Sequence, residues 1–163
     1  MNTTTITTVV ISNHGFAEKL LQPESNHHLL VSARAYQPGD IITNFGSSEI
    51  HKQPSKYTVQ VANDQHIILS PEFLQYINHS CNPNVFFNTS TMELTALQPI
   101  TPGDEFTFFY PSTEWDMAEP FNCLCGSANC LGVIKGAKNI APAVLDTYKL
   151  TNFIQQKRMQ LKD

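Results

Sequence analysis

Short runs of β-branched and aromatic residues recur along most of the chain, with Pro, Gly, Asn and Ser between them. Short apolar runs bounded by turn-forming residues are typical of β-strands. The pattern therefore predicts a mainly β, β-rich α+β fold made of short strands. The expected strands cover residues 3–12, 29–33, 41–45, 57–61, 65–69, 85–88, 93–97 and 105–109.

Two of these strands follow the same turn sequence. Pro38-Gly39-Asp40 and Pro102-Gly103-Asp104 each lead into a strand with Thr and Phe at matching positions. Proline presets φ at the second position of a turn, and glycine accepts the positive φ of the third position of a type II turn. We interpret the repeat as shared local geometry rather than as an internal duplication.

Helical patterns are confined to two segments. Residues 71–76 predict one or two helical turns, with Ser70 as N-cap and Pro71 at the first helical position. Residues 141–161 predict a helical tail packed on the core, with Lys157, Arg158 and Lys162 near its C-terminal end. A partner-binding amphipathic helix is the alternative. The apolar positions of the tail are Val144, Leu145, Tyr148, Phe153, Ile154, Met159 and Leu161.

Length and composition favour one compact domain. The 163 residues are 41% hydrophobic and 15% charged, and no apolar run is long enough to cross a bilayer. The net charge of −4 tells against direct nucleic-acid binding, while a basic partner remains compatible with it. Residues 1–10 lack the basic start and apolar core of a signal peptide, so we expect an intracellular protein, cytoplasmic or nuclear.

The cysteines are the most informative candidates for chemistry. Three of the four form a Cys-x-Cys-x4-Cys cluster at Cys123, Cys125 and Cys130. A disulfide would use two of them and requires an oxidising compartment, whereas closely spaced thiolates suit tetrahedral Zn²⁺. The spacing predicts a zinc site whose fourth ligand is the remaining cysteine, Cys81, with His79 as the nearest substitute.

Three motifs together resemble the SET domain with its post-SET zinc segment. They are Asn-His-Ser-Cys-Asn-Pro-Asn at 78–84, Gly-Asp-Glu-Phe-Thr-Phe-Phe-Tyr at 103–110, and the cysteine cluster closed by Leu131-Gly132. The resemblance implies small curved sheets with a knot-like C-terminal threading near the active site. It also implies a SET domain over 1–120, a post-SET zinc-binding segment over 121–138 and a C-terminal helical tail over 139–163.

The activity implied by this resemblance is methyl transfer from S-adenosylmethionine to a lysine amine of a protein or peptide. Tyr110 matches the catalytic tyrosine of the family, and Asn78 and His79 match its cofactor-contact pair. Cys81 matches the fourth ligand of a structural Zn²⁺. Four thiolate ligands leave the metal no open position for water or substrate. The implied cofactor site consists of Asn78, His79, His28, Leu29 and Leu131.

One element of the family pattern is absent. SET domains usually carry Gly-x-Gly in their first strands, and His27-His28-Leu29 stands at that place. Bulkier side chains there either obstruct the cofactor or replace backbone contacts to it. The alternative hypothesis is therefore a catalytically silent, zinc-stabilised binding module, and a further alternative is transfer to a non-histone or small-molecule amine.

An aromatic stretch precedes the cysteine cluster. Strand alternation places Phe106, Phe108 and Tyr110 on one face and Phe109 on the other, and we expect Phe106 and Phe108 in the core. For Trp115, packing and a role facing substrate or cofactor are both open.

The loop around Trp115 is acidic. Glu114, Asp116 and Glu119 would form a rim suited to a basic peptide, with solvated loop charges as the ordinary explanation.

Overall fold

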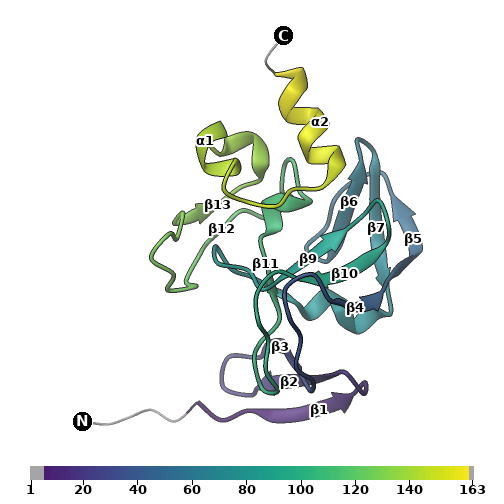
Figure 1. Cartoon of the computed structure of the whole chain (residues 1–163), viewed down its shortest axis with the longest axis vertical. Helices are drawn as coiled ribbons and strands as arrows, with labels where there is room; N and C mark the ends of the chain where they lie inside the picture. Colours follow the sequence, from purple (N-terminus) through teal and green to yellow (C-terminus); the bar gives the residue numbers. More distant parts are fainter. Residues whose placement is uncertain (1–5, 162–163) are drawn as a thin grey trace.

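The computed structural model describes residues 6–161. Within this range the protein is built from small sheets with few and short helices, so the mainly β prediction is confirmed (Figure 1). Residues 3–5 of the first predicted strand and Lys162 of the tail lie outside the described residues.

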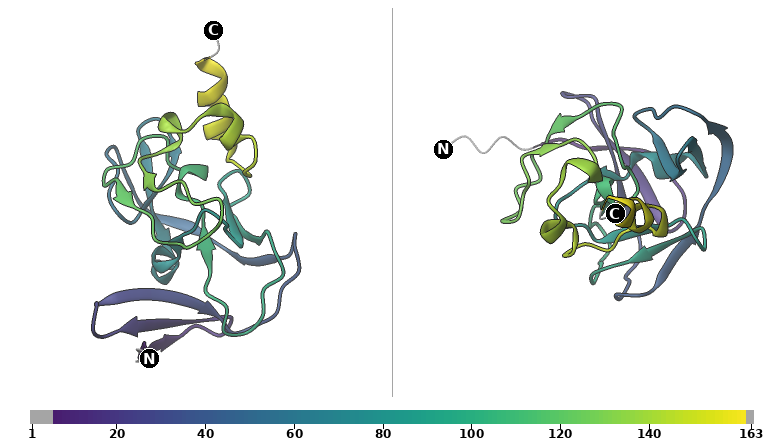
Figure 2. Two further views of the ribbon diagram at one scale, coloured as in Figure 1. Left: turned by 90° about the vertical axis from the view of Figure 1, so that its left-hand side faces the viewer. Right: turned by 90° about the horizontal axis from the view of Figure 1, so that it is seen from above.

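Three antiparallel sheets of three strands each form the body of the protein. The sheet β1-β2-β3 lies at the end away from the C-terminal helices, as Figure 1 and the left view of Figure 2 show. The sheets comprise β1 (Val9–Asn13), β2 (Ala17–Gln22) and β3 (His27–Ser32); β4 (Ile41–Asn44), β10 (Glu93–Ala96) and β9 (Val85–Asn88); and β5 (Gly46–His51), β7 (Gln65–Ser70) and β6 (Thr58–Ala62).

Two pairs of two-residue strands complete the β structure. The first pair is parallel and joins segments far apart in the sequence, and the second closes an antiparallel hairpin. These strands are β8 (Asn78–His79) with β11 (Thr107–Phe108), and β12 (Phe121–Asn122) with β13 (Val133–Ile134).

Every predicted strand overlaps an observed one, with ends displaced by a few residues. The first begins only at Val9. The sequence pattern missed β2, β5 and the two-residue strands β8, β12 and β13. β2 contains no β-branched residue, and β5 exposes most of its side chains, so pairing with neighbouring strands determines both.

The two Pro-Gly-Asp turns have the same geometry. Gly39 and Gly103 adopt φ values of +93° and +96°, which L-residues with a side chain rarely adopt. In each turn the aspartate, Asp40 or Asp104, donates its backbone N–H to the carbonyl of the residue three positions earlier at 3.0 Å. Its carboxylate accepts the N–H of that same residue at 2.8 Å. The prediction of shared local geometry is confirmed.

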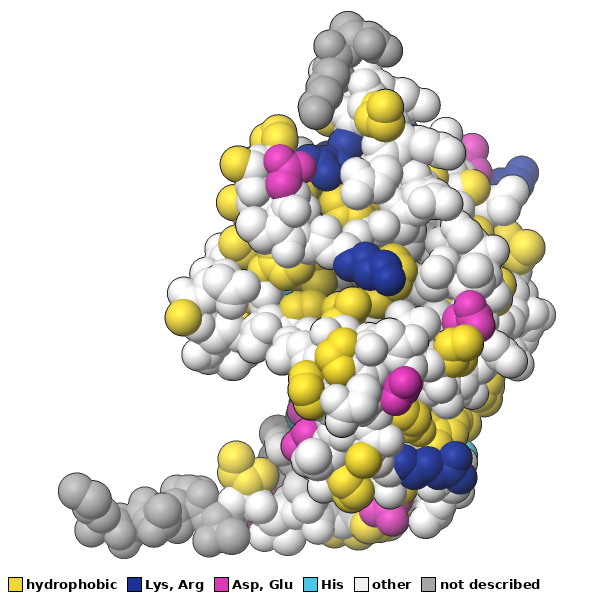
Figure 3. Space-filling view, in the orientation of Figure 1, with side chains coloured by type: hydrophobic (Ala, Val, Ile, Leu, Met, Phe, Trp, Pro, Cys, Tyr) yellow, Lys and Arg dark blue, Asp and Glu magenta, His cyan; other side chains and the backbone are white. Residues whose placement is uncertain are grey.

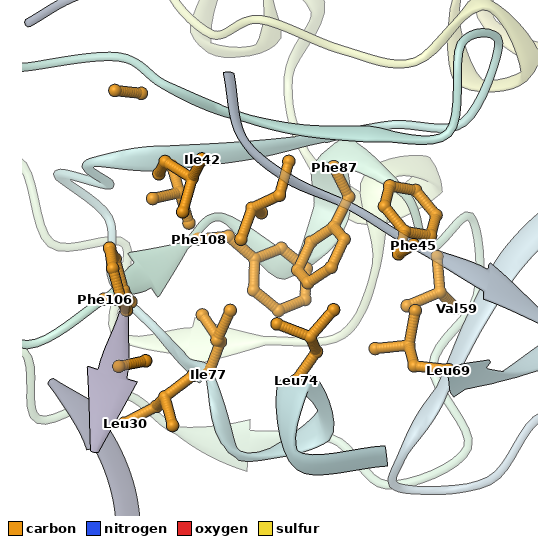
Figure 4. Close-up of a cluster of buried hydrophobic side chains, with 14 of the residues drawn as sticks. Leu30, Ile42, Phe45, Val59, Leu69, Leu74, Ile77, Phe87, Phe106 and Phe108 are labelled. Carbon is orange, nitrogen blue, oxygen red and sulfur yellow. The ribbon is translucent and has the colours of Figure 1, made fainter. Parts of the chain in front are cut away.

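The main core lies where the sheets and the short helix η1 (Glu72–Tyr76) meet, and Figure 4 shows ten of its side chains labelled. Phe87 and Phe106 are fully buried, and the Phe87 and Phe108 rings meet edge to face at 4.8 Å. Edge-to-face contact is a preferred geometry for aromatic pairs. Phe106 and Phe108 are therefore core residues, as predicted.

The start of η1 differs from the expected cap. Ser70 is the last residue of β7, and Pro71 occupies the cap position without a side-chain hydrogen bond. Ser70 is wrong as an N-cap because its backbone is still extended and paired with Gly46 of β5.

The C-terminal tail is helical but interrupted. α1 (Pro142–Leu145) and α2 (Asn152–Gln160) replace the single predicted helix. Thr151 starts α2 anew, since its hydroxyl accepts the N–H of Ile154 at 3.4 Å. The interruption allows Tyr148 to stack on Phe109, with ring centroids 3.7 Å apart.

A second core cluster holds the tail against the rest of the protein. Leu145, Leu150 and Ile154 are buried there with Phe109, which supports the packed-tail interpretation. Met159 and Leu161, by contrast, are exposed because they lie beyond the contact surface. No helix in the range 6–161 is both long and apolar enough to cross a membrane.

Candidate functional site

The motif at 78–84 runs beside the motif at 105–110. The parallel pair β8–β11 joins them, and Ser80 donates its N–H to the carbonyl of Phe108 at 3.0 Å. Asn84 fixes the register, since its amide donates to the Glu105 carbonyl at 2.8 Å and accepts the Thr107 N–H at 2.9 Å. Two motifs separated by some twenty residues in sequence thus form one wall of a site.

A cavity of about 960 Å³ opens beside this wall. The surface is hollowed between the segment that carries β12 and β13 and the end that carries β1 to β3 (Figure 3). The lining includes the predicted catalytic residue Tyr110, the predicted cofactor residues Asn78, His79 and His28, and His27 beside them.

Two predicted cofactor residues lie elsewhere. Leu29 is buried in the protein with 7% of its surface exposed. Leu131 packs against the second core cluster, and its N–H donates to the Cys81 sulfur at 3.4 Å. Neither residue is among those that line the cavity.

Tyr110 is part of the cavity lining. Its hydroxyl donates to the Ile77 carbonyl at 3.4 Å, and its backbone N–H donates to Nδ1 of His79 at 3.1 Å. Burial raises the pKa of this phenol well above its usual range, and the carboxylates of Glu105 and Glu114 add to the effect. Tyr110 is therefore a neutral hydrogen-bond donor, not a base.

His79 links Tyr110 to the cysteines. Burial lowers its pKa to about 4, so the ring is neutral at physiological pH. Because Nδ1 accepts a hydrogen bond from Tyr110, the proton resides on Nε2, which lies 3.4 Å from the Cys81 sulfur. The ring thereby orients both neighbours.

Asn78 fastens this wall to the hairpin of β2 and β3. Its amide donates to the His28 carbonyl at 2.9 Å and lies 3.4 Å from Nε2 of His27. Nδ1 of His28 is buried and has no hydrogen-bond partner among the described residues. Burial, with Lys19 and His27 nearby, lowers the pKa of His28, so the His28 ring that contributes to the cavity lining is neutral.

The four cysteines converge on one point. The Sγ atoms of Cys81, Cys123, Cys125 and Cys130 all lie within 4.8 Å of one another, and no disulfide joins them. The Cys81 and Cys123 sulfurs are 3.9 Å apart. Tetrahedral Zn²⁺ with bonds of about 2.3 Å places its sulfurs about 3.8 Å apart, so the donor set and its spacing fit zinc.

Glu114 does not belong to an acidic rim. Its side chain is buried, and Oε2 accepts the Gln60 N–H at 3.0 Å and the Thr113 hydroxyl at 2.6 Å. Burial raises the pKa of this carboxyl to about 7, although both hydrogen bonds oppose the shift. Glu114 lines the cavity from within. Sequence reasoning missed this position because β6, which supplies Gln60, lies 54 residues away.

The other loop residues also depart from the rim arrangement. Asp116 forms an ion pair with Lys138 at 2.8 Å and does not line the cavity. Of the three predicted rim carboxylates, Glu119 is the one that is both exposed and part of the cavity lining. Trp115 packs against the second core cluster and is not among the residues that line the cavity, so packing is its role here.

Comparison with known proteins places this geometry in a family. The family model described as "SET domain" matches residues 8–111. The chain is 51% identical over 84 residues to methyltransferase flvH from Aspergillus flavus, covering 50% of this chain and 47% of that protein. It is 35% identical over 88 residues to histone-lysine N-methyltransferase SETD1B from Homo sapiens, covering 49% of this chain and 4% of that protein.

A solved structure resembles the same region. KRYPTONITE in complex with mCHG DNA and SAH aligns with a TM-score of 0.50 at 20% identity, over 65% of this chain and 26% of that one. At this identity the likeness concerns the fold alone. The chain spans less than half the length of each relative described above.

Proposed function

Because the chain belongs to the SET-domain family, whose members include methyltransferases, we propose that it transfers a methyl group from S-adenosylmethionine to a lysine amine of a protein substrate. The observation that carries this proposal is the single cavity that brings Tyr110 together with Asn78, His79 and the histidines at 27 and 28. A concave site with a few convergent polar groups is the usual place for such chemistry.

We assign cofactor binding to the end of the cavity near β2 and β3. His27 and His28 line this end of the cavity, and Asn78 holds their strand in place by donating a hydrogen bond to the His28 carbonyl. The histidine side chains thus take the place of the backbone contacts that the Gly-x-Gly element provides. When bound, S-adenosylmethionine supplies an electrophilic methyl group.

We assign the catalytic role to Tyr110. Its neutral hydroxyl can orient the acceptor amine, while Phe121 and His79 surround the phenol with rings at 5.8 and 5.2 Å. Aromatic walls attract an ammonium and its methylated forms and exclude water. Methyl transfer depends on in-line positioning of two reactants, so these contributions address its main requirement.

We propose a structural Zn²⁺ on Cys81, Cys123, Cys125 and Cys130. Four thiolates leave no open position, so the metal would only fix the position of the segment that carries them. Cys123 and Cys125 line the cavity, and Cys81 follows the Asn78-His79 pair, so the metal would join two segments of the lining that are distant in sequence. On this basis we propose the division into residues 1–120, 121–138 and 139–163.

Titration calorimetry tests the proposal first. Zinc-loaded protein should bind S-adenosylmethionine and S-adenosylhomocysteine saturably, and Tyr110→Phe should abolish turnover while keeping that binding. The matched control is Tyr36→Phe, because it makes the same chemical change at a tyrosine that is not among the residues lining the cavity.

The second candidate is a catalytically silent binding module, favoured by the absence of glycine at 27–29. No binding at millimolar cofactor would support it and overturn the methyltransferase proposal. If the cofactor binds, a panel of histone proteins, other lysine-containing proteins and small amines identifies the acceptor class.

A further inference from the structure

Three carboxylates line the cavity, and they differ in exposure. Glu119 is exposed at its mouth, and Glu105 is half-buried close to Asn78 and His27. Glu114 is buried, with 8% of its surface exposed. Its backbone N–H donates to the Tyr110 carbonyl at 3.0 Å, so the two residues are held one backbone turn apart.

Among the described residues, no cation forms an ion pair with Glu114. Both of its hydrogen-bond donors, the Gln60 N–H and the Thr113 hydroxyl, are neutral. An ionised carboxylate that is removed from water without a cation is strongly destabilised. A cationic group entering the cavity would remove that penalty.

We propose that Glu114 binds the ammonium group of the acceptor as it enters the cavity beside Tyr110, before the amine gives up the proton that methyl transfer requires it to lose, and thereby selects a cationic lysine side chain. This assignment rests on the proposed function, because it names the group that recognises the acceptor of that reaction. Val59, Leu69 and Phe108 also line the cavity and suit the aliphatic stem of a lysine. The apolar wall and the buried carboxylate together match the two chemically different parts of that side chain.

The charge state of Glu114 is consistent with this role. Burial raises its pKa to about 7, which means that ionisation in the empty cavity is unfavourable. An ammonium bound next to the carboxylate would favour ionisation and lower that pKa again. At pH 8 the carboxyl is mainly ionised and a lysine amine, with an ordinary pKa of about 10.4, is protonated.

Crossing two ligands with two protein variants tests the assignment at pH 8. The probes are Nα-acetyl-lysine N-methylamide and the norleucine analogue, which keeps most of the aliphatic stem and lacks the ammonium. Binding to the zinc-loaded protein saturated with S-adenosylhomocysteine is followed by NMR titration. The unaltered protein should prefer the lysine probe at least ten-fold, and Glu114→Gln should remove that preference.

Glu119→Gln is the matched control, because it makes the same chemical change at the exposed carboxylate of the cavity. It should retain the preference for lysine. The assignment is overturned if Glu114→Gln prefers the lysine probe as strongly as the unaltered protein does. It is also overturned if Glu114→Gln and Glu119→Gln lose that preference equally, because the selectivity would then come from the total negative charge of the cavity.

A second measurement uses the unaltered protein and does not depend on the folding of any variant. Carboxyl ¹³C NMR of the unaltered protein should show the apparent pKa of Glu114 falling when the lysine probe binds, and an unchanged value would refute the contact. None of these readouts requires turnover. Lysine preference without methyl transfer therefore counts against the proposed function alone, and turnover without a Glu114 effect counts against this inference alone.

Discussion

Replacing Gly136 with alanine should destabilise the protein more than the same replacement at any other described glycine. Gly136 adopts φ +129° and ψ +165°, a conformation that essentially only glycine occupies. A Cβ atom there would lie 2.5 Å from the Trp115 carbonyl oxygen and 3.0 Å from Cα of Asp116. Both are backbone atoms of the loop that carries Glu114.

That loop has little freedom to retreat. The Trp115 carbonyl accepts the Lys138 N–H at 3.1 Å, and the Glu114 carbonyl accepts the Ala137 N–H at 2.9 Å. Backbone strain contributes about 1–3 kcal/mol and overpacking about 1–3 kcal/mol more. We therefore expect Gly136→Ala to lower the free energy of unfolding by about 2–6 kcal/mol. Each kcal/mol lost should lower Tm by about 2–4 °C.

Gly39→Ala is the matched control. Gly39 also has positive φ, at +93°, but a Cβ there meets nothing within 4 Å, so only the strain contribution of about 1–3 kcal/mol should remain. Urea denaturation of both variants measures the difference. If Gly136→Ala loses no more stability than Gly39→Ala, the close approach to Trp115 is not a real constraint.

Three further predictions concern the metal site, the tail and pH. Cys81→Ser should lower zinc content and stability as much as Cys125→Ser does, and unchanged zinc content by atomic absorption would mean a different fourth ligand. Tyr148→Phe removes two hydrogen bonds, one that the hydroxyl donates to the Cys81 carbonyl at 2.6 Å and one that it accepts from the Asn129 amide at 3.2 Å, and each should cost about 1 kcal/mol. Tyr148→Ala also loses the stack on Phe109 and should cost clearly more. Equal losses in thermal unfolding would contradict this. Folding raises the pKa of Glu114 from 4.5 to about 7, so the native state binds this proton more tightly than the unfolded state does. The free energy of unfolding should therefore fall as pH rises from about 4.5 through 7. At 1.36 kcal/mol per pKa unit the expected loss is about 3 kcal/mol. Glu114→Gln should flatten that part of the pH–stability curve, and an unchanged slope would show that other groups cause it.

Local chemistry explains which parts of the fold were predictable. The Pro-Gly-Asp turns form because proline and glycine restrict the backbone in their own vicinity. The strands rich in β-branched and aromatic residues were likewise recognisable, as β9 (Val85–Asn88) illustrates. β2 was not, since its residues carry little β-propensity and it becomes a strand by pairing on both sides.

The candidate site divides in the same way. The sequence alone determined the Cys-x-Cys-x4-Cys cluster, the Asn78-His79 pair and the motif ending in Tyr110, because each depends on residues a few positions apart. The sequence also predicted Cys81 as the fourth ligand by elimination, and the structure brings its sulfur within 4.8 Å of the other three. Only the tertiary structure decided that Glu114 is a buried cavity carboxylate rather than a rim charge, and that the tail breaks into two helices. Each of these outcomes depends on contacts between segments distant in sequence, and burial, which sets the charge state of Glu114, exists only once those segments have packed together.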